Sequence, residues 1–563
     1  MRNLFVLLFV SVSVNLFAQQ IEFSEAVRRL VGETEAEALD ANQMELFNDL
    51  YHHPADINKS TRSYLESTGL FTPFQVASLI DYRDRHGYIQ SIVELASVDG
   101  FTEQSADCLK PFIIFDSQYQ KMTQTPAFSG DMSIRYGYKK DNAKDVTKST
   151  YGLKARIRYS DKLTMTLATT EPYDSLKFYP TVYSASILFH HRAGKIVVGD
   201  FNARFGQGLC VWNTASFSSL NSPSSFMKRP SGIAAVNSFT GSTALTGFAA
   251  DMESGRWKLS AILSLPGLKQ ISRQPDKLKL SPMLNLTRFG RYGHVGCTHY
   301  MVFSSFLSND YRIPAMRTSF DGSCCIKGVN LFGEGVYDWV ENKLSILTGS
   351  EFGLADNIRM AAMVRYLPVS NEHGAAVASE VLFGVHEFHG SVDALYHPVS
   401  KSKDTDRSCQ IKGQISWICK INAHWMTKVR FAERFRTWGI PSKMELRTEV
   451  ISTYGNWKTS FRADAVYGCS LAGLAYLEGG YLAGRISAYL RCGIFHIDNW
   501  DDRIYVYERD PPGNFNVPSF YKRGLWVSGY IAYRPSYWCK LYLRGIFKKP
   551  GNAELKLYSI LEF

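Results

Sequence analysis

The chain has 563 residues, of which 45% are hydrophobic, 13% aromatic and 20% charged, and its net charge is +11. This composition excludes a disordered chain, which combines few apolar residues with high charge, and the length allows two or more domains. The 31 Tyr, 35 Phe and 10 Trp favour a β-rich protein with aromatic belts over a soluble α/β enzyme.

Residues 1–18 have the pattern of a signal peptide. A short cationic start at Met1–Asn3 precedes an apolar run from Leu4 to Val14, and Ala18 offers a small residue for cleavage. The run is too short to span a bilayer, and no later stretch reaches the roughly 18 apolar residues that a transmembrane helix needs. The sequence therefore predicts a secreted chain that is either soluble or a β-barrel.

Residues 19–116 are predicted to form a helical domain. Apolar residues recur at three- and four-residue spacing over 26–31 and again over 44–51, as on the buried face of a helix. Ser60 or Thr61 is a candidate N-cap for the next helix, and Thr72 followed by Pro73 is a stronger N-cap signal.

Within this domain, residues from about 56 to 113 contain two similar units. They resemble the tandem helix-hairpin-helix domain of competence-type DNA-binding proteins, in the version that precedes barrel domains in Bacteroidetes outer-membrane proteins. The resemblance is carried by Asp56-Ile57-Asn58-Lys59-Ser60, Leu70-Phe71-Thr72-Pro73-Phe74-Gln75, Ile80-Asp81-Tyr82-Arg83, Ser91-Ile92-Val93-Glu94-Leu95 and Val98-Asp99-Gly100-Phe101. Segments 198–201, 205–209, 502–508 and 517–518 look like parts of the same barrel family.

The resemblance implies that backbone N–H groups of each hairpin point at a DNA phosphate without reading bases. The residues that it marks as nucleic-acid contacts are Asn58, Lys59, Thr72, Gln75, Arg83, Gly100, Thr102, Gln104 and Lys110. The sequence departs from the family pattern, because Leu70 and Thr72 stand where the first hairpin has its glycines and Thr102 replaces the second glycine of the other. A protein-docking or structural module therefore remains the alternative.

Residues 130–563 are predicted to form a transmembrane β-barrel. Strict alternation of apolar and polar residues begins at 132–139 and recurs at 153–159 and 163–168, with short turns between. The alternation continues to Leu555, Leu557, Ser559, Leu561 and Phe563, which resembles the terminal strand of outer-membrane barrels. Trp526, Tyr530, Tyr533, Tyr537 and Trp538 are predicted to contribute to an aromatic girdle. About 20 to 25 residues per strand and connection gives on the order of 16 to 22 strands, with an even count.

Basic residues share the face of these strands that is predicted to line the lumen. They are Arg135, Lys139, Lys154, Arg156, Arg158, Lys428 and Arg430. Such a face attracts polyanions such as DNA or the phosphates of lipopolysaccharide. The alternative is that Asp and Glu of neighbouring strands pair with these cations.

The sequence contains no motif of a catalytic site, a metal site or a cofactor site. It lacks a Gly-x-Ser-x-Gly elbow and a phosphate-binding loop, and the histidines of His386-Glu387-Phe388-His389 would point to opposite faces of a strand. Residues 214–243 are expected to form a long surface loop or to fold into the lumen. The acidic segment 498–513 is expected to be a solvated loop, because it lacks the spacing of a calcium loop.

These patterns predict a mainly β, non-enzymatic outer-membrane barrel with a small N-terminal all-α domain in the periplasm, and no cofactor or bound metal. The leading hypothesis for function is DNA binding by the helical domain, during DNA uptake. The alternatives are an assembly protein whose helical domain docks a periplasmic partner or plugs the barrel, and a small-solute channel. The expected partners are outer-membrane lipid, DNA or a periplasmic protein, and the barrel-assembly machinery.

Overall fold

A computed structural model gives the architecture of the chain. It describes residues 23–31, 41–115, 128–141, 146–160, 162–171, 182–191, 193–213, 220–236, 239, 244–265, 279–304, 312–355, 357–397, 407–437, 442–512, 516–549 and 551–563. The predicted signal peptide lies outside these residues. Within them, none of the helices combines the length and the apolar character needed to cross a membrane.

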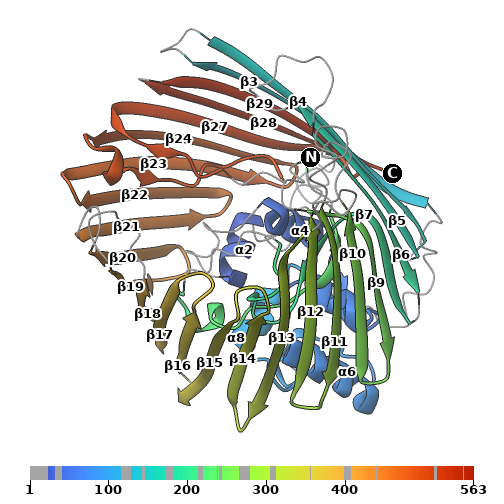
Figure 1. The fold of residues 1–563 in the computed structure, drawn as a ribbon. Helices are drawn as coiled ribbons and strands as arrows, with labels where there is room; N and C mark the ends of the chain where they lie inside the picture. Colours follow the sequence, from blue (N-terminus) through green and yellow to red (C-terminus); the bar gives the residue numbers. More distant parts are fainter. Residues whose placement is uncertain are drawn as a thin grey trace.

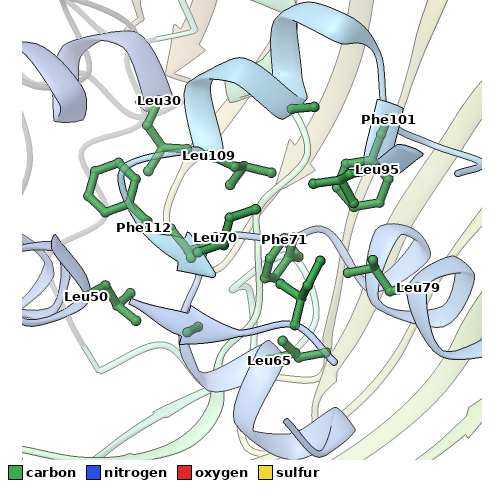
Figure 2. Close-up of a cluster of buried hydrophobic side chains, with 14 of the residues drawn as sticks. Leu30, Leu50, Leu65, Leu70, Phe71, Leu79, Leu95, Phe101, Leu109 and Phe112 are labelled. Carbon is green, nitrogen blue, oxygen red and sulfur yellow. The ribbon is translucent and has the colours of Figure 1, made fainter. Parts of the chain in front are cut away.

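The N-terminal part is helical, as the periodicity predicts. Its helices are α2 (Phe23–Val31), α4 (Ala41–His52), α5 (Arg62–Ser67), α6 (Pro73–His86), α7 (Ile92–Ala96) and α8 (Glu103–Leu109). Two short parallel strands, β1 (Ala55–Asp56) and β2 (Ile113–Ile114), join its beginning to its end. Figure 2 shows the core between these elements, which includes Leu65, Leu70, Leu95 and Phe112. The helices therefore share one apolar core of their own.

Side-chain caps fix where the short helices begin. The Thr61 hydroxyl accepts a hydrogen bond from the backbone N–H of Tyr64, which confirms one of the two predicted caps of α5. Thr72 caps α6 in a capping box with Gln75, and Pro73 occupies the first turn, where its missing N–H costs nothing. The turns between α5 and α6 and between α7 and α8 are thereby fixed in position.

The rest of the described chain forms a closed antiparallel barrel (Figure 1). The strands are β3 (Phe128–Asp141), β4 (Val146–Tyr159), β5 (Leu163–Glu171), β6 (Val182–His191), β7 (Gly194–Arg204), β8 (Gly232–Ala235), β9 (Leu245–Ser254), β10 (Trp257–Leu265), β11 (Lys279–Phe289), β12 (Gly293–Ser304), β13 (Arg312–Ile326), β14 (Val329–Asp338), β15 (Lys343–Ala355), β16 (Ile358–Leu367), β17 (Glu372–Phe383), β18 (His386–His397), β19 (Ser408–Lys420), β20 (Trp425–Arg436), β21 (Ser442–Tyr454), β22 (Trp457–Tyr467), β23 (Leu471–Ala483), β24 (Ile486–Ile497), β27 (Lys522–Ser536), β28 (Cys539–Lys549) and β29 (Asn552–Glu562). A separate two-stranded sheet pairs β25 (Ile504–Tyr505) with β26 (Ser519–Phe520). Two short 3₁₀ helices, η2 (Pro223–Ser225) and η5 (Trp500–Asp502), complete the described elements.

The barrel wall has 24 strands, because β7 pairs directly with β9 and the short β8 is an addition to that pairing. The expected even count is confirmed, but the expected range of 16 to 22 is wrong. The reason is the length of the connections. At one end of the barrel they take only two to four residues, so a strand with its connection uses less chain than assumed.

The outer face of the wall is apolar. Large hydrophobic side chains such as Ile134, Tyr136, Leu555 and Leu557 are exposed on it, and polar side chains alternate with them on the inner face. A closed barrel leaves no unpaired strand edge, and an apolar outer band suits contact with lipid. The prediction of an outer-membrane β-barrel is confirmed.

Two aromatic residues do not lie where the girdle prediction placed them. Trp526 and Tyr530 occupy the inward-facing positions of β27, and Trp526 is fully buried. The Trp526 indole N–H donates to Glu508 Oε1 at 2.9 Å, so this side chain fills the lumen. Tyr537 and Trp538 are exposed at the short-connection end, as expected for an interfacial girdle.

The two ends of the barrel differ in their connections. One end has only short turns, whereas the other carries the long connections 205–244, 266–278 and 498–521. Outer-membrane barrels have short periplasmic turns and longer extracellular loops. The short-turn end is therefore the periplasmic end.

Candidate functional site: the occupied lumen

The helical part lies inside the ring of strands (Figure 1). Its α6 packs against β12 and β13, and α5 packs against β8. The wall residues that it contacts lie near the short turns, which places the helices in the periplasmic half of the lumen. A domain held in this position narrows the passage through the barrel.

Helix α4 is bound to β4 by buried ion pairs. Lys154 forms an ion pair with Glu45, and Arg156 Nη1 lies 2.5 Å from Asp49 Oδ1. The Arg156 Nη2 atom also lies 2.6 Å from Asp131 Oδ1 of β3. Burial raises the pKa of Asp49, but the opposing charges of Arg156 and Arg158 outweigh it and lower this pKa to about 2. Asp49 is therefore ionised at neutral pH.

Helix α5 is bound to the wall by a second buried network. Lys258 Nζ of β10 lies 2.6 Å from Glu66 Oε2 and 3.7 Å from Asp251 Oδ2. The Ser63 hydroxyl donates to Asp251 Oδ2 at 3.3 Å, and Lys195 Nζ lies 3.5 Å from the same oxygen. Removing one member of such a buried pair leaves an uncompensated charge, so these contacts oppose release of the helix.

The first hairpin of the helical domain faces a barrel loop. Arg229, in the connection between β7 and β9, donates from Nη1 to the backbone oxygen of Leu70 at 2.9 Å. The guanidinium of Arg62 lies 4.2 Å from the ring centroid of Phe289 on β11. The described part of the connection, including residues 220–236, thus folds inward, which is one of the two outcomes expected for 214–243.

A tight turn anchors the start of this connection. The Glu334 carboxylate of β14 accepts backbone N–H bonds from Gln207 at 2.7 Å, Leu209 at 3.0 Å and Cys210 at 3.1 Å. Gly206 has φ +58°, and a Cβ there would lie 2.9 Å from the Glu334 carboxyl carbon. The glycine lets the backbone wrap around the carboxylate, in a nest of amide donors.

The acidic connection between β24 and β27 also folds into the lumen. Asp510 accepts hydrogen bonds from Arg544 at 3.0 Å and from Lys556 at 2.8 Å. Asp502 and Glu508 are buried as well. The expectation of a solvated loop is wrong for these carboxylates, because they pair with cations, an indole and backbone amides of the barrel. It holds for Asp498, Trp500 and Asp501, which are exposed. Among the described residues, no group of three or more His, Cys, Asp or Glu could hold a metal ion.

Three of the predicted nucleic-acid contacts support the helical domain itself. The Asn58 amide exchanges two hydrogen bonds with the backbone of Ile89, at 2.8 and 2.9 Å. Arg83 donates to two backbone oxygens in the segment 57–60, and Gln75 Nε2 donates to the backbone oxygen of Gly100 at 2.9 Å. Gln75 thereby joins the two units of the domain, whereas Arg83 and Asn58 fix the first unit and the segment that follows it.

The remaining predicted contacts lie at the hairpins and on the surface. Thr72 and Thr102 cap α6 and α8, and Gly100 has φ +88° with the ring of Phe74 against it. Lys59 and Lys110 are exposed, and the side chain of Gln104 lies outside the described part. Lys59 Nζ lies 3.7 Å from the Asp56 carboxylate.

All seven basic residues predicted for the lumen occupy inward-facing positions, but they do not form one continuous surface. Lys154 and Arg156 bind the helical domain, and Arg158 Nη2 lies 3.8 Å from Asp49 Oδ1. The guanidinium of Arg135 lies 4.0 Å from the ring centroid of Phe239. In the strand register Lys139 stands opposite Glu554, Lys428 opposite Glu449, and Arg430 opposite Ser416 and Arg447.

The sequence reasoning missed the acidic half of these contacts. Glu45, Asp49 and Glu66 were not singled out, although all three lie on the wall-facing sides of α4 and α5. The signal in the sequence is an acidic residue beside a buried apolar position, as with Glu66 after Leu65. That signal identifies a partner only once the barrel wall is known.

The fold and its lumen define an outer-membrane β-barrel protein with an internal helical domain. No protein-family model and no curated protein matches the chain. Among solved structures, it is similar to the siderophore receptor PirA from Pseudomonas aeruginosa, with a TM-score of 0.42 and 6% identity over 78% of this chain and 81% of that chain. The copper transporter OprC gives a TM-score of 0.41 and 8% identity, over 77% and 80% of the two chains. The ferric citrate transporter FecA gives a TM-score of 0.35 and 9% identity, over 78% of this chain and 79% of that chain. The helix-hairpin-helix resemblance stays a prediction.

Proposed function

We propose that the chain is a gated solute channel of the outer membrane, and that its N-terminal helices are the plug. The observation that carries this proposal is the set of buried ion pairs that join α4 and α5 to the inner face of the wall. A domain held by such pairs stays in the lumen until a ligand or a partner favours its release. Transport then requires displacement of the plug.

The charge placement supports a plug that can dock again after release. Glu45 and Asp49 lie on one helix, and their partners Lys154 and Arg156 lie two residues apart on one strand face. Complementary charges of this kind steer the helix toward the strand and determine the position in which it docks. The helical domain also has its own apolar core, so it can leave the wall without exposing that core.

The test is electrical conductance in planar bilayers. The full chain is compared with a variant that lacks residues 23–115. We expect the deletion variant to form a large and steady pore and the full chain to conduct several-fold less. Asp81→Asn is the matched control, because its pair with Arg85 lies on the exposed side of α6. Heat-modifiable gel mobility verifies that each barrel has folded, and equal conductance of the full and deleted chains would contradict the proposal.

Docking of a periplasmic protein fits the same arrangement. The helical domain lies in the periplasmic half of the lumen, where a partner from that side can bind it and shift the docking equilibrium. DNA binding by the domain stays a separate prediction from its sequence. The full chain titrated with fluorescent duplex DNA over a salt series tests it, and Lys59→Gln with Lys110→Gln should weaken any such binding.

A further inference from the structure

Three cations stand side by side on the inner face of the wall near its extracellular end. They are Lys412 of β19, Arg434 of β20 and Lys443 of β21, which are direct cross-strand partners in the register. Directly opposite residues have Cβ atoms about 5 Å apart, and like charges at that spacing repel. A row of three adjacent cations is therefore unfavourable unless anions balance it.

The inward-folded connection between β24 and β27 adds to this row. Lys443 Nζ donates to the backbone oxygen of Asp501 at 3.2 Å, which places the loop against the row. The loop's Arg503 lies within electrostatic range of Arg434, as does Arg436 two residues further along β20. Two acids, Glu445 and Asp501, are also in range of Arg434, and Lys412 and Lys443 flank it in the register. The row is the centre of a cationic cluster, defined here as Lys412, Arg434, Arg436, Lys443 and Arg503.

Two acids border this row. Asp393 of β18 stands opposite Lys412 in the register and forms an ion pair with Arg365, and Glu445 Oε1 lies 3.4 Å from Lys443 Nζ. Elsewhere in the lumen Arg447 stands directly opposite the buried Asp464 in the register, and the Nε atoms of Arg447 and Arg462 each lie 2.7 Å from the Asp464 carboxylate. In the cluster, by contrast, Lys412 is exposed although it faces inward. The Arg434 Nε atom is buried without a hydrogen-bond partner among the described residues. The row thus combines charge excess with access from the lumen.

We propose that this cationic cluster is a binding site for a small, soluble, phosphate-bearing anion with several negative charges, such as a diphosphate group. Arginine binds phosphate oxygens in a bidentate manner, and lysine adds point charge. The spacing of the cations along the row suits an anion with more than one charged group. The role of this site in transport rests on the proposed channel function. In that channel, the site selects phosphate-bearing anions as the solute.

The experiment is calorimetric titration of the detergent-solubilised full chain with inorganic pyrophosphate at low salt. We expect binding that weakens as NaCl is raised, because the contacts are electrostatic. Lys412→Gln and Arg434→Gln should each weaken binding roughly tenfold. Lys420→Gln is the matched control, since Lys420 lies on the same strand face at the periplasmic end and pairs there with Glu387. It should change the affinity by less than about twofold.

Two results would overturn the site. One is absence of pyrophosphate binding by the wild-type chain at low salt, and the other is an equal loss of affinity in Lys420→Gln. A parallel titration with lipid A micelles distinguishes the source of the phosphate, because binding of lipid A without binding of pyrophosphate would also refute a soluble ligand. The titration does not depend on plug movement. A failed conductance test with intact pyrophosphate binding would therefore refute the gated channel alone.

Discussion

The pair between Glu66 of α5 and Lys258 of β10 permits a quantitative test of plug docking. Both side chains are almost completely buried, and the charged atoms lie 2.6 Å apart. Glu66→Gln removes the negative charge with little change of shape and leaves Lys258 in the wall. The substitution should therefore weaken docking of the helical domain without disturbing the barrel.

The magnitude follows from the surroundings of Lys258. Breaking a buried pair by removing one partner costs about 3–5 kcal/mol when the remaining charge is left alone. Here Asp251 Oδ2 remains 3.7 Å from Lys258 Nζ and compensates part of that charge. We therefore expect about 2–3 kcal/mol, which is roughly a 30- to 150-fold shift of the docking equilibrium toward release.

A double-mutant cycle separates the pair from other effects. Glu66→Gln, Lys258→Gln and the double variant are measured by the frequency of channel opening in planar bilayers and by hydrogen exchange of α5. Replacing both members of a buried pair is often nearly neutral, so the double variant should return to within a few fold of the wild type. If the two single effects simply add, or if Glu66→Gln behaves like the wild type, the ion pairs do not hold the plug.

Two further predictions concern acid and the lumen loop. Burial, and next the charge of Lys540, lower the pKa of His52 from 6.5 to about 3 in the docked state, so the released domain binds more protons as the pH falls. Docking should thus weaken from about pH 6.5 down to about pH 3. Asp49 adds to this loss below about pH 4, because the Asp49 of the released domain then takes up a proton, whereas the docked carboxylate keeps its charge down to a pKa of about 2. His52→Gln should reduce the dependence of conductance on pH above pH 4, and an unchanged pH profile would argue against this assignment. Gly206→Ala should destabilise the turn on Glu334 by about 1–3 kcal/mol, because its φ is +58° and its Cβ would lie 2.9 Å from the carboxyl carbon. Gly255→Ala is the control for backbone strain alone, because Gly255 has φ +57° and no atom lies within 4 Å of an added Cβ. Equal protease sensitivity of the 205–236 segment in the two variants would contradict the role of the turn.

Local structure in this chain is readable from the sequence because local interactions determine it. Thr72 and Pro73 mark the start of α6 through a cap and a proline whose roles depend only on neighbouring residues. The alternation in β3, β4 and β29 likewise separates inward from outward positions, since side chains alternate along any strand. The fold class and the inward placement of the basic residues follow from that periodicity.

The contents of the lumen could not be predicted in the same way. Alternation assigns Arg156 and Trp526 to a face, but it does not say that Asp49 and Glu508 occupy the space beside them. Glu66 and Lys258 are separated by 192 positions in the chain, and nothing local to either residue identifies the other. The number of strands was underestimated for a related reason. The estimate depends on the length of the turns, and the turns at the periplasmic end are shorter than was assumed.

The most direct test of the central claim is a distance measurement between the helical domain and the wall in lipid nanodiscs. Spin labels at Arg85 on α6 and at Lys327 in the turn between β13 and β14 are attached in a background whose ten native cysteines are replaced. The account predicts one narrow distance distribution at neutral pH, which Glu66→Gln broadens toward longer distances. A broad distribution in the unmodified domain, with no response to Glu66→Gln, would show that the helices do not occupy the lumen.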